Sequence, residues 1–231
     1  MGCDVIAVEP QPRLINGTFI VFFPFLFDSQ KTKIGINLTL ELNDVSHKVK
    51  VYNNIIANEN GRMKIVYAEK CWACSHVEKI NENEPLNLNP NNEYVIPAIR
   101  VDDIVKEDVL LLKIDVEGFE VYAIQSALQL ISNYNVQNIL VEWFPGRWLS
   151  NHAVERGTEI LEQLGNLGYE VVHYNLRMAL PKHELVEQQI PDVGASWVLS
   201  QEQLKRINEW LGNRGEANFW IRKIDKRINK I

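Results

Sequence analysis

The segment from Val109 to Glu120, VLLLKIDVEGFE, passes from an apolar run into a cluster of acids. The run from Val109 to Ile114 is typical of a strand buried on both faces of a parallel sheet, which helices then cover. Asp115 ends this run, and a helical pattern of apolar residues begins after Gly118. We therefore expect Asp115 and Glu117 at the carboxyl edge of the sheet, where open α/β sheets bind their ligands.

Two other short apolar segments also end in a carboxylate. Residues 4–10, DVIAVEP, lead to Glu9, and residues 137–142, QNILVE, end at Glu142. Three strands that each deliver an acid to one edge would build an acidic rim around a crevice, which suits a ligand with hydroxyl or amino donors. The structural alternative is that such acids cap helix starts and complement the helix dipole.

These strand ends resemble the motifs of one known family, the FkbM-type S-adenosylmethionine-dependent methyltransferases. Members carry a strand ending in A-x-E-P, followed at a distance by L-K-I-D-x-E-G-x-E. The matching residues here are Ala7 to Pro10 and Leu112 to Glu120. The similarity extends over roughly Val5 to Tyr174, with supporting segments at 49–61, 99–105 and 139–142.

The resemblance implies an α/β, Rossmann-like class I methyltransferase fold with a doubly wound, mostly parallel sheet and an antiparallel last strand. A chain of 231 residues with 46% apolar content can bury one sizeable core. We therefore expect a single methyltransferase-like domain over 1–231, with an apolar insertion at 18–27, an exposed loop at 78–92 and a polar tail at 223–231.

One part of the family pattern is missing. The first strand and its glycine-rich D-x-G-x-x-x-G loop should precede the A-x-E-P strand, and none of the twelve glycines forms a substitute loop. In such folds this loop lets the backbone approach the cofactor. The expectation is an N-terminally incomplete chain or a degenerate relative, in which binding of S-adenosylmethionine is weak or absent.

The chemistry that the resemblance implies is transfer of a methyl group to an oxygen of a small-molecule or sugar-like acceptor. Such a displacement needs positioning and a base for the hydroxyl proton. Glu9 would bind the ribose hydroxyls, and Asn58 would reach the adenine amino group unless it is an ordinary turn residue. Asp115 and Glu117 would face the methyl group or the acceptor, as base or metal ligand, with Glu142 a further candidate base. The sequence defines no dedicated metal site.

Other interpretations stay open. The chain could be a non-catalytic remnant of the fold that acts, if at all, as a binding module. The apolar segment 18–27 is too short to span a bilayer, so it is an intron-derived insertion, a membrane-surface or partner contact, or a core element. Cys71 and Cys74 have redox-motif spacing and His76 follows, but a zinc site needs a fourth ligand.

Charge and targeting signals bear on partners and location. The formal net charge of −6 argues against a nucleic-acid partner, which normally requires a basic face. No secretory signal precedes the first strand, so a cytoplasmic protein is expected. The expected partner is a small-molecule acceptor, and the sequence does not define an oligomeric state.

The remaining pattern predicts alternating helices and strands. Ser200 and Gln203 form a capping box for a helix that ends near Leu211. The alternation in 34–42 fits a strand or a helix, and the resemblance favours a helix. The other expected elements are strands at 48–56, 62–68, 94–99, 169–174 and 217–222, and a helix at 153–167.

Overall fold

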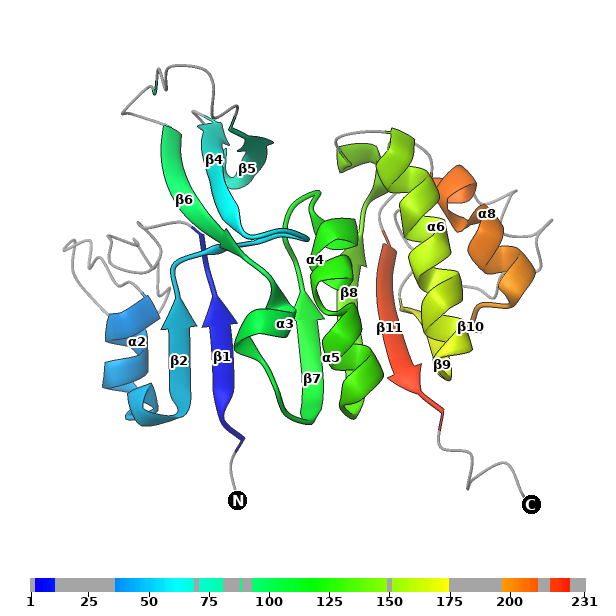
Figure 1. Cartoon of the computed structure of the whole chain (residues 1–231), viewed down its shortest axis with the longest axis horizontal. Helices are drawn as coiled ribbons and strands as arrows, with labels where there is room; N and C mark the ends of the chain where they lie inside the picture. Colours follow the sequence, from blue (N-terminus) through cyan, green and yellow to red (C-terminus); the bar gives the residue numbers. More distant parts are fainter. Residues whose placement is uncertain are drawn as a thin grey trace, which may run out of the picture. The chain divides into compact units, whose positions relative to one another are not determined.

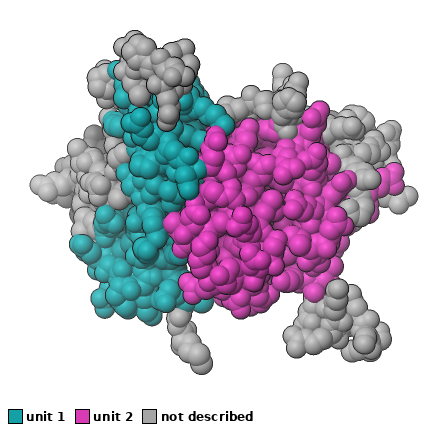
Figure 2. Space-filling model, viewed as in Figure 1, with its two compact units in different colours: residues 1–55, 60–99 teal, residues 56–59, 100–231 magenta. Residues whose placement is uncertain are grey.

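The computed structural model describes residues 3–10, 36–68, 71–80, 88, 93–148, 151–174, 197–211 and 217–224. Two compact units result, one from Met1–Ile55 and Asn60–Ile99, the other from Ile56–Glu59 and Arg100–Ile231 (Figure 2). We describe each unit by itself, and the single domain expected from the sequence stays a prediction. The segment 18–27 and the tail beyond 224 lie outside the described residues.

The first unit contains a short parallel strand pair. Strand β1 (Val5–Val8) pairs with β2 (Val49–Tyr52), and Val5 lies opposite Val49 (Figure 1). The side-chain amide of Asn53 donates to the carbonyls of Glu9 and Pro10 at 2.9 and 3.0 Å. This contact fixes the chain just after β1. Helix α2 (Ile36–Leu42) confirms the helical alternative for this segment, and η1 (Ser46–Lys48) follows it.

A four-stranded sheet has the order β3-β6-β4-β5. Its strands are β3 (Ile55–Ile56), β4 (Gly61–Ala68), β5 (Cys71–Lys79) and β6 (Glu93–Ile99), and β4 runs antiparallel to β5 and β6. Lys64 pairs across the strands with Glu78 at 2.8 Å and with Glu93 at 3.3 Å. The prediction that an exposed loop begins at residue 78 is therefore wrong at its start, since Glu78 and Lys79 belong to β5.

The second unit is built on a mixed five-stranded sheet with the order β10-β9-β11-β8-β7. Strand β7 pairs in parallel with β8, whereas β11 is antiparallel to both β8 and β9. The prediction of an antiparallel last strand is thus confirmed. The bounds are β7 (Val109–Ile114), β8 (Val136–Trp143), β9 (Tyr169–Tyr174), β10 (Trp197–Val198) and β11 (Ala217–Lys223).

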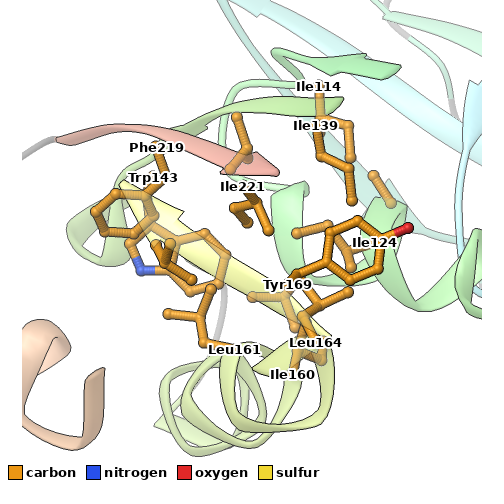
Figure 3. Packing of buried hydrophobic residues seen from close by; sticks show 14 of the residues in the cluster. Ile114, Ile124, Ile139, Trp143, Ile160, Leu161, Leu164, Tyr169, Phe219 and Ile221 are labelled. Atoms are coloured by element: carbon orange, nitrogen blue, oxygen red, sulfur yellow. The ribbon is translucent and has the colours of Figure 1, made fainter. Parts of the chain in front are cut away.

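The core of this unit lies between the sheet and its helices. Alternate residues of β8 and β11, among them Ile139, Trp143, Phe219 and Ile221, point into one buried cluster with α6 (Figure 3). This is the period of two that places every second side chain of a strand on the same face. The helices are α3 (Val101–Ile104), α4 (Glu120–Ser126), α5 (Leu128–Asn133), α6 (Asn151–Asn166) and α8 (Gln201–Leu211), with the short η2 (Pro145–Arg147).

The opposite face of the sheet carries polar pairs. The Trp220 indole donates to Asn138 Oδ1 at 2.9 Å, and Arg222 pairs with Glu170. Among the described residues, the core-forming helices of this unit pack on the other face. The described structure is therefore mixed α/β and does not confirm a doubly wound arrangement.

Strand β7 differs from the strand expected from its apolar run. Leu110 and Leu111 are 55% and 50% exposed, so the expectation of burial on both faces is wrong. The reason is position: β7 is the edge strand of its sheet, with β8 its neighbour among the described strands. A parallel strand is buried on both faces only where other elements cover both faces, and Leu111, opposite Asn138, lies on the face away from the core cluster.

Local chemistry explains where the elements end. The expected strand 48–56 is broken into β2 and β3 because Asn53 and Asn54 donate to distant carbonyls. The capping box of α8 is confirmed, since the amides and side chains of Ser200 and Gln203 exchange hydrogen bonds at 2.8 and 3.2 Å. No helix in the described part of the chain is long and apolar enough to cross a membrane.

His173 of β9 is buried, and its Nε2 has no hydrogen-bond partner among the described atoms. Its ring lies edge-on to Phe219, with 5.7 Å between centroids. Burial lowers the pKa of His173 from 6.5 to about 4. Below pH 6.5 the unfolded chain therefore binds a proton that the folded chain does not, and protonation favours unfolding.

We expect His173 to lower the free energy of unfolding by up to about 3 kcal/mol as the pH falls from 6.5 to about 4. His173→Leu should remove this dependence, and urea unfolding at several pH values measures it. His47→Leu, at an exposed position of η1, is the matched control. Equal pH slopes in the wild type and His173→Leu would contradict this account.

Candidate functional site

Three carboxylates meet at the ends of two adjacent parallel strands. Asp115 and Glu117 follow β7, and Glu142 lies near the end of β8. One oxygen from each lies within 4.8 Å of the others. The structure thus brings together the acids of two of the three strand ends expected to form an acidic rim, whereas Glu9, from the third, belongs to the other unit. We call Asp115, Glu117 and Glu142 the acid trio. Their catalytic roles stay predictions.

Two cations accompany the acid trio. Lys113 Nζ lies 2.8 Å from Asp115 Oδ2, and Arg147 of η2 pairs with Glu117. Both Lys113 and Asp115 are well exposed, so water screens that pair and its main effect is orientation. Lys113 and Arg147 offset part of the charge of Asp115 and Glu117, and the carboxylate oxygens suit a ligand that donates hydrogen bonds.

The turn after β7 is tightly constrained. Glu117 and Gly118 have φ angles of 51° and 100°, in the left-handed region. A Cβ at Gly118 would lie 2.7 Å from the carbonyl oxygen of Arg147. The backbone of this turn therefore packs directly on the backbone of η2, which is possible only with glycine at this position.

Glu120 lies beneath this turn at the start of α4 and is 1% exposed. Its Oε1 accepts from the Gly118 amide at 2.8 Å, and its Oε2 accepts from the Trp148 indole at 2.9 Å. Burial raises the pKa of the Glu120 carboxyl, these donors act in the opposite direction, and the charge of Asp115 raises the pKa further. The sequence contained Glu120 within its motif but gave no signal of a role.

Asn58 lies in the same unit as the acid trio. Its Oδ1 is buried and has no hydrogen-bond partner among the described residues, and the same holds for Oε1 of Gln125. The Arg100 guanidinium donates to the backbone carbonyls of both residues and pairs with Asp102 at 2.6 Å. The proposed contact of Asn58 with the adenine amino group stays a prediction, and the alternative of an ordinary turn residue stays open.

Glu9 belongs to the first unit, directly after β1. Its amide donates to the Tyr52 carbonyl at 3.0 Å, which continues the parallel ladder by one residue. The predicted position of this acid at a strand end is confirmed, and its contact with ribose stays a prediction.

The cysteine pair lies on β5, where Cys71 and Cys74 are three residues apart. Their side chains fall outside the described part of the chain. Among described side chains, the acid trio is the group whose ligand atoms come close enough to hold a metal ion. Two of its members already have cationic partners, so the geometry alone does not define a metal centre.

Comparison with known proteins assigns the family. The methyltransferase FkbM domain matches residues 1–171, and the chain therefore belongs to the FkbM methyltransferase domain family. The match includes the turn after β7, the acid trio and Glu9. No curated protein and no solved structure matched the chain.

A matched pair of glycine substitutions tests the close approach of the turn to η2. Gly168 has a φ of 87° and open space around its Cβ position, whereas Gly118 has both a positive φ and the 2.7 Å contact. Gly168→Ala should cost about 1–2 kcal/mol of stability through backbone strain alone. Gly118→Ala should cost at least about 1 kcal/mol more because the methyl group displaces η2. Urea unfolding measures both, and equal losses would show that η2 moves freely.

Proposed function

We propose that this chain is an S-adenosylmethionine-dependent methyltransferase whose acceptor is the hydroxyl group of a small or sugar-like molecule. The observation that carries the proposal is the convergence of Asp115, Glu117 and Glu142 within 4.8 Å at two parallel strand ends. This is the edge at which α/β sheets bind their ligands. The family assignment supports the same class of reaction.

Asp115 is the best candidate for the base. Its side chain is 42% exposed, so an acceptor hydroxyl can reach it from solvent. Glu117 is less accessible and is held by Arg147, which suits a residue that orients the acceptor. Glu142 adds negative charge from the neighbouring strand. A carboxylate within hydrogen-bond reach of the hydroxyl would accept its proton as the new bond forms.

The bound cofactor would supply an electrophilic methyl group on a sulfonium. In this proposal Asn58 Oδ1 accepts a hydrogen bond from the adenine amino group, because that buried oxygen has no partner within the described chain. The assignment of Glu9 to the ribose hydroxyls rests on its motif, since acids after the second strand bind the ribose in related folds. The proposal includes the doubly wound, Rossmann-like arrangement of the family.

A binding module without catalysis is the second candidate. It is favoured by one observation, the lack of a glycine-rich cofactor loop among the twelve glycines of the sequence. In related folds that loop supplies backbone amides that cradle the cofactor. Affinity for the cofactor and transfer of the methyl group therefore need separate measurements.

We expect the 231-residue chain to bind S-adenosylmethionine weakly, with a dissociation constant above about 0.1 mM, or not at all. The reason is that the ribose and adenine contacts remain while the loop contacts are missing. Titration calorimetry on the purified chain measures this. An affinity in the micromolar range would show that another segment replaces the loop.

Asp115→Asn should keep the fold and lower methyl transfer about 10²- to 10⁴-fold, because an amide cannot accept the hydroxyl proton. Single-turnover transfer at millimolar cofactor measures the rate without limitation by weak binding. Glu117→Gln is the matched control and should cost less if Glu117 orients the acceptor. An Asp115→Asn protein that retains the wild-type rate but melts at a lower temperature would show a structural role for this acid.

A further inference from the structure

We infer that Glu120 is a positioning residue, which fixes the acid trio by joining the turn after β7 to the segment after β8. The inference deepens the proposed function and rests on it. Glu120 acts in this role without touching a substrate, because its carboxylate is buried beneath the turn.

The two oxygens of Glu120 bind one donor from each side. The Gly118 amide, at 2.8 Å, belongs to the turn that carries Asp115 and Glu117. The Trp148 indole, at 2.9 Å, belongs to the segment that begins with Glu142 on β8. A single carboxylate thus joins the two chain segments that supply the acid trio, beside the contacts of Arg147 with Glu117 and Gly118.

The Trp148 side of this link is held by the core. Its ring packs edge-on against Trp143, with 4.8 Å between centroids and planes at 86°. A Cβ at Gly157 of α6 would lie 2.7 Å from the Trp148 ring, so the ring fits closely against that helix. Trp143 in turn donates to Asn208 of α8 at 2.8 Å. Trp148 is therefore a fixed point against which Glu120 can hold the turn.

Two residues of the acid trio are sequence neighbours of residues that form this link. Glu117 precedes Gly118, whose amide binds Glu120, and Glu142 precedes Trp143, which packs on Trp148. Arg147, which pairs with Glu117, precedes Trp148 itself. A shift of the turn or of Trp148 would change the distances within the acid trio directly.

Keeping a charged carboxylate in this buried position costs free energy. Burial raises the pKa of Glu120, which reports the cost of keeping the charged form there. Two N–H groups point at it from opposite segments, and the carboxylate accepts from both. An amide in its place would direct its own N–H group at one of these donors, so Glu120→Gln should break one link while preserving shape.

The test uses two variants of the full chain, Glu120→Gln and Trp148→Phe. Trp148→Phe keeps an aromatic ring, smaller than the indole, and removes the N–H donor. Glu107→Gln, at an exposed position before β7, is the matched control. Both test variants should lower the single-turnover rate of methyl transfer about 10- to 100-fold. The KM for the acceptor should change by less than about 3-fold, because the acceptor does not contact Glu120.

A double-variant cycle separates positioning from general damage. If Glu120 acts through Asp115, adding Glu120→Gln to Asp115→Asn should cause little further loss of rate. An additive loss would overturn the inference. So would a rate for Glu120→Gln equal to that of Glu107→Gln.

Amide hydrogen exchange provides a readout that needs no activity. In Glu120→Gln the Gly118 amide and the Trp148 indole should exchange at least about tenfold faster, whereas amides of β9 and β11 should be unchanged. Unchanged protection of both groups would overturn the inference even if the variant loses activity. A wild-type chain that transfers no methyl group would instead refute the proposed function, and the exchange data would still decide whether Glu120 joins the two segments.

Discussion

Trp148 packs edge-on against Trp143 in the space that Gly157 leaves open on α6, and its indole donates to a carboxylate that also holds the neighbouring turn. The arrangement of the second unit depends on this contact. The core under the sheet fixes the Trp143 and Trp148 rings, and the rings fix Glu120 and, through Gly118, the turn after β7. The acidic cluster at the sheet edge is therefore held by the same apolar packing that stabilises the unit.

Much of this site could be predicted from local sequence. An apolar run followed by an acid places the acid at a strand end, and two such parallel neighbours bring Asp115 and Glu142 to one edge. The role of Glu120 could not be predicted in this way, because an acid at a helix start is normally interpreted as a capping residue. Its role depends on Trp148, which lies 28 residues further along the chain.

The fold shows the same division between local and distant effects. The α8 capping box and the strand 169–174 follow from local pattern and were predicted correctly. The exposure of Leu110 and Leu111 depends on which strands flank β7, and the break between β2 and β3 depends on Asn53, whose partners lie 43 and 44 residues away. Periodicity in the sequence carries no information on such distant contacts.

The central claim is that the acid trio faces the reacting groups and that Asn58 contacts the adenine of the cofactor. Titration of the ¹⁵N-labelled chain with millimolar S-adenosylhomocysteine, followed by amide chemical shifts, tests it most directly, since this method detects weak binding. The account predicts that any saturable shifts fall at the turn after β7, at Glu142 and at Asn58. Saturable shifts confined to other elements would contradict it.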